Sequence, residues 1–194
     1  MELQLPMTLK MGNLMSEEKF FQFCQMNDTL QLERDSKGNV IVMSPTGSFT
    51  GNLNSRILVF LFMWNEQTAA GQVFDSSTGF TLPNRAVRSP DVSWVRKERW
   101  DSLSAEQQEK FAPVSPDFVI EIRSKSDGLR YLIDKMDEYI ANGTQLAWLI
   151  DRFDKKVHIY KADRSIAIHE SIQVKLSGES VLPGFELDLA EILK

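Results

Sequence analysis

The segment 115-SPDFVIEIRSKSD-127 decides the fold, because it places charged side chains in a run that otherwise predicts a buried strand. An unpaired buried carboxylate is costly, so interior strands normally exclude charge. Side chains alternate along a strand, which puts Asp117, Glu121 and Arg123 on one face. At about 3.3 Å per residue, Asp117 and Glu121 lie roughly 13 Å apart, too far to hold one metal ion together. We therefore expect Asp117 to mark the strand entry and Glu121 to take a partner from another strand.

The elements around this strand predict an α/β (α+β) domain built on a mixed central sheet. A helix expected over 127–141 is followed by a strand over 145–151, and this strand–helix–strand order implies a right-handed parallel crossover. Earlier in the chain, turn residues between strand-like runs predict antiparallel hairpins. The remaining expectations are hairpins over 30–44 and 72–83, helices over 16–27, 51–70 and within 98–111, strands over 91–97 and 156–162, and two short β segments in the tail.

The composition, with 42% hydrophobic and 25% charged residues, fits one globular domain over 1–194. We expect an N-terminal helix and hairpin over 1–45 and the main core over 46–194. The longest apolar run, 57-ILVFLFMW-64, is far shorter than the about 20 residues that cross a bilayer, and the N-terminus lacks a signal-peptide pattern. The single cysteine, Cys24, can form no internal disulfide, which favours the reducing cytoplasm.

The formal net charge of −5 argues against a protein that coats nucleic acid by bulk electrostatics. Two basic clusters, 96-RKER-99 and 152-RFDKK-156, fit solvated strand ends or turns. Several catalytic templates are absent from the sequence: it contains no Gly-rich phosphate loop, no GxSxG elbow and no zinc-type ligand spacing. The function must therefore be sought in the charged residues of the central strands.

Asp91 is the best candidate partner for Glu121, because it heads the expected strand 91-DVSWVRK-97 and neighbouring strands lie only about 4.8 Å apart. Two hard carboxylates at a sheet edge suit Mg²⁺, which takes one or two protein carboxylates and fills its other positions with water and substrate phosphate. Two plainer interpretations stay open. Asp91 also fits a turn cap, and Glu121 also fits a structural ion pair with Arg123.

A phosphate-binding site also needs a positive group, and three candidates follow Glu121. Arg123 lies about 6.6 Å further along the same face, and its guanidinium stays protonated, so it stabilises charge but is a poor base. Lys125 lies just past the strand. Lys135 falls on the following helix, roughly 115° from the centre of the apolar stripe. From that flank it could reach across the sheet edge, or extend along the surface as an ordinary flank lysine.

A set of motifs in order along the chain resembles the Uma2 family (DUF820), bacterial proteins abundant in cyanobacteria, of the PD-(D/E)xK restriction-endonuclease-like superfamily. The resemblance runs from about residue 16 to residue 189. It implies a mixed central sheet flanked by helices and a metal-dependent phosphodiesterase site. The motifs are 43-MSPTG-47, 89-SPDVSWVRKERW-100, 116-PDFVIEIRSKSD-127, 135-KMDEYIANG-143, 147-AWLID-151 and 157-VHIYK-161.

By position, the resemblance implies that Asp91 is the metal-binding aspartate and Glu121 the (D/E) of the superfamily motif. Arg123 stands where lysine is usual, and Lys135 matches a lysine that has migrated to the helix. The backbone carbonyl of Ile122 would help to hold the metal, which is Mg²⁺ with Mn²⁺ as a possible substitute. Relatives often carry an acidic residue or histidine near the start of the first long helix, where this chain offers only Phe49, Asn52 and Asn54.

Three functions follow as hypotheses. The first is a Mg²⁺-dependent endonuclease that hydrolyses DNA phosphodiesters, with Asp91 and Glu121 as metal ligands, Lys135 positioning the water and Arg123 stabilising the phosphate. The second is an inactive DNA- or protein-binding module on the same scaffold, favoured by the acidic net charge and the missing first-helix carboxylate. The third is a glycoside-processing enzyme, which predicts no basic partner for its two carboxylates. A homodimer is expected from the surplus of apolar and aromatic residues.

Overall fold

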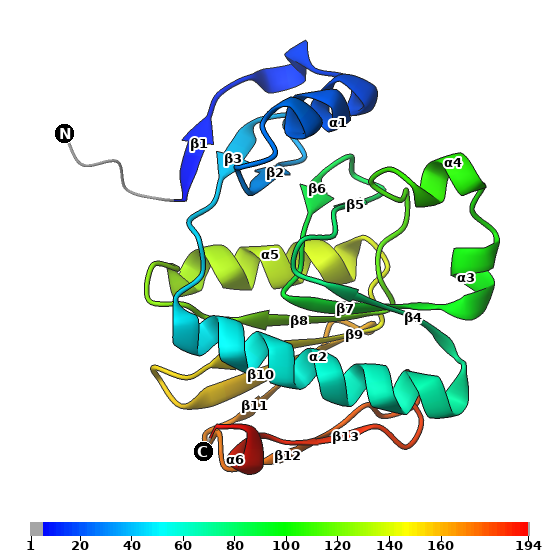
Figure 1. Cartoon of the computed structure of the whole chain (residues 1–194). Coiled ribbons are helices and arrows are strands. Elements are labelled where there is room, and N and C mark those ends of the chain that lie inside the picture. The colour runs from blue at the N-terminus through cyan, green and yellow to red at the C-terminus, as the bar shows by residue number, and fades with distance from the viewer. Residues whose placement is uncertain (1–5, 194) are drawn as a thin grey trace.

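The computed structural model describes residues 6–193, so residues 1–5 and Lys194 of the expected domain lie outside it. The predicted α/β class with a mixed sheet is confirmed, since a six-stranded sheet has the order β11-β10-β9-β8-β7-β4 (Figure 1). Strands β8 and β9 are parallel and are joined through helix α5 (Leu129–Ala141), as expected, while the other neighbours are antiparallel. The strands are β4 (Gly71–Asp75), β7 (Val92–Arg96), β8 (Phe118–Ile122), β9 (Leu146–Asp151), β10 (Lys156–Lys161) and β11 (Ile166–His169).

Two helices cover opposite faces of this sheet (Figure 1). Helix α2 (Ser48–Thr68) packs its apolar stripe on one face, together with β12 (Lys175–Ser177), β13 (Glu186–Asp188) and α6 (Leu189–Ile192). Helix α5 packs on the other face, where the alternation along β8 places Val119 and Glu121. The one charged residue of β8, Glu121, therefore faces α5. The α2 stripe is Leu53, Ile57, Leu61 and Trp64, and the α5 stripe is Leu132, Met136 and Ile140.

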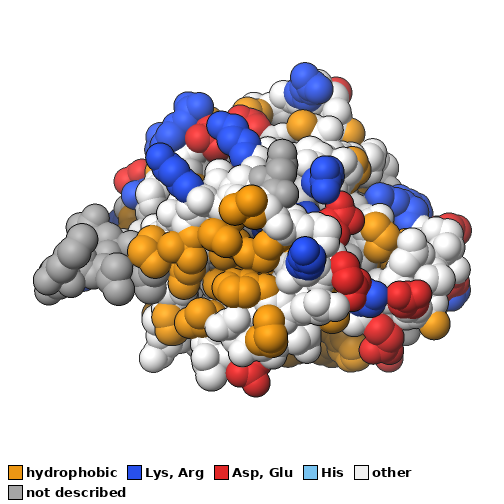
Figure 2. Space-filling view, turned by 90° about the horizontal axis from the view of Figure 1, so that it is seen from above, with side chains coloured by type: hydrophobic (Ala, Val, Ile, Leu, Met, Phe, Trp, Pro, Cys, Tyr) orange, Lys and Arg blue, Asp and Glu red, His pale blue; other side chains and the backbone are white. Residues whose placement is uncertain are grey.

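An N-terminal layer lies above α5 in Figure 1 and is built on a five-stranded sheet of order β1-β3-β2-β6-β5. Helix α1 (Glu17–Met26) begins as predicted at Ser16, whose Oγ accepts a hydrogen bond from the Lys19 amide at 3.2 Å. Figure 2 looks down on this layer and shows hydrophobic side chains gathered on its exposed face. The other elements of the layer are β1 (Met7–Leu9), η1 (Gly12–Leu14), β2 (Leu32–Arg34), β3 (Val40–Val42), β5 (Phe80–Thr81) and β6 (Val87–Arg88).

The hairpin expected over 72–83 is wrong. Strand β4 pairs with β7 in the central sheet, whereas β5 pairs with β6 in the N-terminal layer. Asp75 does hold a tight turn, since its Oδ1 accepts hydrogen bonds from the amide and the hydroxyl of Ser77. Beyond that turn Phe80 pairs with Arg88 of β6, and its buried ring packs edge-on against Phe74 of β4 in the core below α5. The N-terminal layer thus takes strands from beyond residue 45.

The helix expected within 98–111 is two short helices, α3 (Lys97–Asp101) and α4 (Ala105–Gln108). The chain breaks between them because Ser104 caps α4, with its side chain and that of Gln107 each accepting from the other's backbone amide. Trp94 and Trp148 are fully buried in the core below α2. No helix within residues 6–193 combines the length and the apolar character needed to cross a membrane.

Candidate active site

Asp91 and Glu121 meet at the ends of two neighbouring interior strands of the central sheet, β7 and β8. Val92 of β7 lies opposite Ile120 of β8, and continuing this register sets Asp91 opposite Glu121. Asp91 accepts a hydrogen bond from the Ile122 amide at 2.7 Å on Oδ2 and from Asn54 Nδ2 of α2 at 3.0 Å on Oδ1. The carboxylate is therefore held between the end of β8 and helix α2, beside the residue that the sequence paired with it.

Lys135 bridges two carboxylates within this site. Its Nζ lies 2.8 Å from Glu121 Oε1 and 2.8 Å from Glu33 Oε1, and the residue is only 4% exposed. The Tyr139 hydroxyl, one helical turn further along α5, also donates to Glu121 Oε1 at 3.0 Å. The flank of α5 that would reach solvent in an isolated helix is covered here by the N-terminal layer. Lys135 is thus a buried bridging group rather than a surface lysine.

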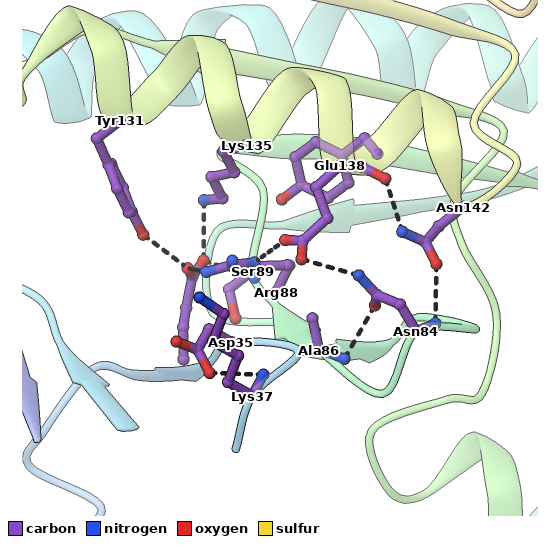
Figure 3. A network of polar contacts seen from close by, with 12 residues as sticks. Asp35, Lys37, Asn84, Ala86, Arg88, Ser89, Tyr131, Lys135, Glu138 and Asn142 are labelled. Atoms are coloured by element: carbon purple, nitrogen blue, oxygen red, sulfur yellow. Dashed lines mark hydrogen bonds and ion pairs between the residues drawn. The ribbon is translucent and has the colours of Figure 1, made fainter. Parts of the chain in front are cut away.

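Glu33 is the site residue that sequence analysis missed. It comes from β2 of the N-terminal layer and is 2% exposed. Besides Lys135, its carboxylate accepts from Arg88 Nη1 at 2.9 Å, the Ser89 amide at 3.0 Å and the Tyr131 hydroxyl at 3.3 Å. Figure 3 shows Tyr131 and Lys135 directed from α5 toward Arg88 and Ser89. The N-terminal layer therefore supplies part of the site.

The same network continues along α5 away from the pocket. Arg88 Nε contacts Glu138 Oε2 at 2.6 Å, and Asn84 Nδ2 donates to Glu138 Oε1 at 2.9 Å (Figure 3). The backbone N–H of Asn84 donates to Asn142 Oδ1 at 2.8 Å. Because Arg88 contacts both Glu33 and Glu138, one guanidinium connects the N-terminal layer to helix α5. This chain of contacts fixes the side-chain positions around Lys135.

The two carboxylates that contact Lys135 have pKa values shifted in opposite directions by their surroundings. Burial alone would raise the pKa of Glu33, but the charges of Lys135 and Arg88 outweigh it and lower the pKa to about 2. For Glu121 burial dominates, with repulsion from Asp91 and Glu33 added to it, and raises the pKa to about 8 against the attraction of Lys135. The pKa of Lys135 lies well above its ordinary value, because both glutamates oppose the effect of its burial. Lys135 is therefore a permanent cation.

Asp91, Glu121, Lys135 and Glu33 line one pocket, and Asp91 also lines an adjoining cleft toward Asn54. No cluster of three or more His, Cys, Asp and Glu side chains within residues 6–193 has the arrangement of a metal site. Four acidic residues line the pocket, and two of them, Asp91 and Glu121, come from neighbouring strands of the central sheet beside the buried cation of Lys135. The other pocket residues are Pro6, Gln31, Leu32, Met43, Ser44, Thr46, Ser76, Ser89, Ile122, Ser124, Ser126, Asp127 and Leu132.

Arg123 is not brought to this pocket. Its Nη1 lies 2.7 Å from Asp151 Oδ2 and 3.1 Å from Asp154 Oδ2, beyond the end of β8. The ion pair between Glu121 and Arg123 that the sequence left open is absent from the described residues, because Glu121 pairs with Lys135 instead. Lys125 is likewise not among the residues that line the pocket.

Asp117 lies at the opposite end of β8 from Glu121, just before the strand begins. Its carboxylate accepts from the Arg96 amide at 2.9 Å and pairs with Arg99 Nη1 at 2.9 Å. The residue is 3% exposed and lies outside the pocket. This is the strand-entry role expected for it, and it leaves Glu121 as the one carboxylate of β8 in the pocket.

Comparison with known proteins agrees with the fold and the motifs. The sequence matches the Uma2 family, described as "Putative restriction endonuclease", over residues 17–190. A crystal structure of "a putative nuclease belonging to DUF820" from Anabaena variabilis ATCC 29413 is similar with a TM-score of 0.73 at 16% sequence identity. The similarity covers 92% of this chain and 97% of that one, and at this identity it shows the shared fold alone.

A short similarity to a curated mouse protein, NADH dehydrogenase (ubiquinone) 1 alpha subcomplex subunit 4-like 2, reaches 49% identity over 45 residues. The matched segment makes up 22% of this chain and covers about half (52%) of that protein's length. A match of this extent assigns no family. The match over residues 17–190 involves most of the chain, and the resemblance inferred from the motifs is confirmed: the chain belongs to the Uma2 (DUF820) family.

Proposed function

We propose that this protein is a nuclease that hydrolyses DNA phosphodiester bonds with Mg²⁺ or Mn²⁺ as cofactor. The observation that carries the proposal is the meeting of Asp91, Glu121 and Lys135 in one pocket at the ends of β7 and β8. Membership of a family described as "Putative restriction endonuclease" supports the same reaction class. The contact between Glu121 and Lys135 counts against the glycoside-processing hypothesis, which predicted carboxylates without a basic partner.

The pocket residues fit a hard divalent cation. Asp91 and Glu121 offer carboxylate oxygens from neighbouring strands, and Mg²⁺ needs only one or two such ligands beside water and substrate. Asn54 Oδ1 is a buried oxygen without a hydrogen-bond partner among residues 6–193, although the amide nitrogen of the same side chain donates to Asp91. We infer that Asp91 and Glu121, with the Ile122 carbonyl, would hold the cation, and that the Asn54 oxygen is a further candidate ligand from the adjoining cleft.

The charge of each side chain in the pocket would then determine its role in catalysis. The bound cation would supply an activated water and offset the charge that develops on the phosphate. Lys135 remains protonated, so it orients that water and stabilises the negative phosphate rather than removing a proton. Glu33 and Tyr139 hold the ammonium group and the Glu121 carboxylate in position. Arg123, expected from the sequence to stabilise the phosphate, has no part in this arrangement, because its guanidinium pairs with Asp151 and Asp154 outside the pocket.

Metal affinity is expected to rise with pH and to level off above about pH 8. A metal ligand must be ionised, and the pKa of Glu121 is raised to about 8, so binding below that pH releases a proton. One linked proton changes the affinity about tenfold per pH unit well below the pKa, and the slope falls near it, so affinity should increase about 50-fold between pH 6 and pH 8. Calorimetric titration with Mn²⁺ in buffers of different ionisation enthalpy measures both quantities. Affinity that does not change over this range would contradict the role of Glu121.

The inactive binding module remains the second candidate, and a specific observation favours it. Lys135 and Arg88 already pair with Glu33, Glu121 and Glu138, so most of the buried charge is compensated by the protein itself. This candidate predicts that neither Mg²⁺ nor Mn²⁺ binds in a manner that depends on Asp91. Titration of the wild type and of Asp91→Asn therefore separates the two candidates.

We further propose that the protein forms a homodimer through β11, the edge strand of the central sheet. Edge strands expose unpaired backbone groups that favour pairing, and this one carries Ile166 and Ile168, each 49% exposed. The substitution Ile168→Lys should convert the dimer to a monomer, because two lysines would face each other across the paired edge. Light scattering after size-exclusion chromatography measures the mass. A wild-type monomer, or a dimer that persists in Ile168→Lys, would refute this interface.

A further inference from the structure

Beside the pocket, a guanidinium lies between two aromatic rings. Arg152 Cζ is 4.9 Å from the ring centre of Phe49 and 4.4 Å from that of Phe153. Phe49 lies at the start of α2, and Arg152 and Phe153 lie in the turn between β9 and β10. Both rings remain on the surface, at 55% and 43% exposure. We call Phe49, Arg152 and Phe153 the aromatic clamp.

The charge at the centre of this clamp has no anionic partner in the described part of the chain. Arg152 Nη2 donates to the Thr50 hydroxyl at 3.3 Å, and its Nε is buried without a partner. Arg123 also contacts the clamp, since its Cζ lies 5.6 Å from the ring centre of Phe153, but its charge is paired with two aspartates. A guanidinium without a counterion matches the geometry of a phosphate, and exposed aromatic faces stack on flat heterocycles. The combination fits a nucleic-acid strand whose bases are accessible.

The clamp lies next to the carboxylate pocket. Thr50, which contacts Arg152, precedes Asn54 by four residues of α2, about 6 Å along the helix, and Asn54 contacts Asp91. In Figure 1 the start of α2, the end of β8 and the turn between β9 and β10 lie together at the left end of the sheet. A nucleic-acid strand bound at the clamp would therefore run past Asp91 and Glu121.

We propose that the aromatic clamp binds single-stranded DNA, with a backbone phosphate on Arg152 and unpaired bases stacked on Phe49 and Phe153. The proposal names the substrate class of the proposed nuclease and rests on that function. In a duplex the base faces are covered by their neighbours, whereas each base of a single strand can stack on an aromatic ring. A purely structural contact between α2 and the β9–β10 turn would leave the exposed rings and the unpaired charge without a role.

The test measures binding without cleavage. Fluorescence anisotropy of a labelled oligodeoxynucleotide, in buffer with EDTA, should show tighter binding of the single strand than of the duplex of the same sequence. Phe49→Ala and Phe153→Ala should each weaken single-strand binding about 5- to 100-fold. Arg152→Ala should weaken single-strand binding. It should also reduce the dependence of the affinity on salt concentration by the equivalent of about one phosphate contact. Phe62→Ala is the matched control, since Phe62 is 52% exposed on the same helix, and it should bind like the wild type.

Two results would overturn the clamp: equal or tighter binding of the duplex, or unchanged single-strand binding in both phenylalanine variants. Phe153→Leu keeps an apolar contact to Arg152 and guards against loss of folding, and it should still lose most of the stacking. The outcomes separate this proposal from the nuclease itself. Clamp-dependent binding without metal-dependent cleavage would reject the nuclease alone, whereas cleavage with clamp-independent binding would reject the clamp alone.

Discussion

The substitution Glu121→Gln is expected to abolish metal-dependent DNA cleavage while the protein stays folded. Glutamine keeps the size of the side chain and can still accept from Tyr139, but it removes the negative charge that would bind the cation. A bound cation supplies several kcal/mol of transition-state charge stabilisation, so its loss corresponds to a rate reduction of about 1,000-fold. Cleavage of single-stranded and duplex DNA in Mg²⁺ and in Mn²⁺ measures the effect.

Asp117→Asn provides the matched control for this experiment. Asp117 is also a buried carboxylate of the β8 region, but it pairs with Arg99 and lies outside the pocket. The control should retain cleavage per folded molecule, even where its stability falls. Cleavage by Glu121→Gln at the wild-type rate would show that the site has been assigned to the wrong residues.

The second large effect is expected from Lys135→Met. Methionine fills a similar volume but leaves Glu121 without a cation and Glu33 with Arg88 alone. Removal of one partner from a buried ion pair typically costs about 3–5 kcal/mol, because the remaining charge stays buried. The free energy of unfolding in urea should fall by about 3 kcal/mol or more. Cleavage should fall as well, since the phosphate loses its buried cation.

Lys110→Met separates the contribution of burial from that of charge pairing. Lys110 also bridges two carboxylates, with Nζ 2.9 Å from Glu18 and 2.9 Å from Glu106, but these groups lie at the surface. Its substitution should leave the free energy of unfolding close to that of the wild type, because solvent screens exposed pairs. Equal losses in the two variants would contradict the view that the buried position of Lys135 makes its ion pairs strong.

Much of the fold was predictable, because local patterns determine it. The run at 118–122, the helix after it and the strand at 146–151 form the parallel unit that their order predicts. The failure at 72–83 has a different origin. Asp75 and Ser77 form the expected turn, but the partners of the two flanking strands are chosen by contacts distant in sequence. Turn residues predict where a chain reverses and do not predict which sheet each strand joins.

The candidate site was predictable where chemistry and alternation act together. An acid inside an apolar strand demands a partner, and this argument predicts Glu121 and Asp91. It leaves Arg123, Lys125 and Lys135 open as the positive group, and the resemblance to the Uma2 family is what implies Lys135. Glu33 carries the same signal, an acid in the strand-like run 30-LQLERD-35, but the hairpin around it also fits a solvated strand. Its burial arises because the N-terminal layer packs over α5, far away in sequence. Arg88, which the same packing brings to the site, carries no local signal.

Anomalous diffraction from crystals soaked in Mn²⁺ tests the central claim most directly. The proposed site predicts one strong peak within about 2.0–2.3 Å of carboxylate oxygens of both Asp91 and Glu121, with Lys135 beside it. The peak should vanish in Glu121→Gln and persist in Asp117→Asn. A peak elsewhere in the molecule, or none at a Mn²⁺ concentration that supports cleavage, would contradict the assignment of this pocket as the metal-dependent catalytic site.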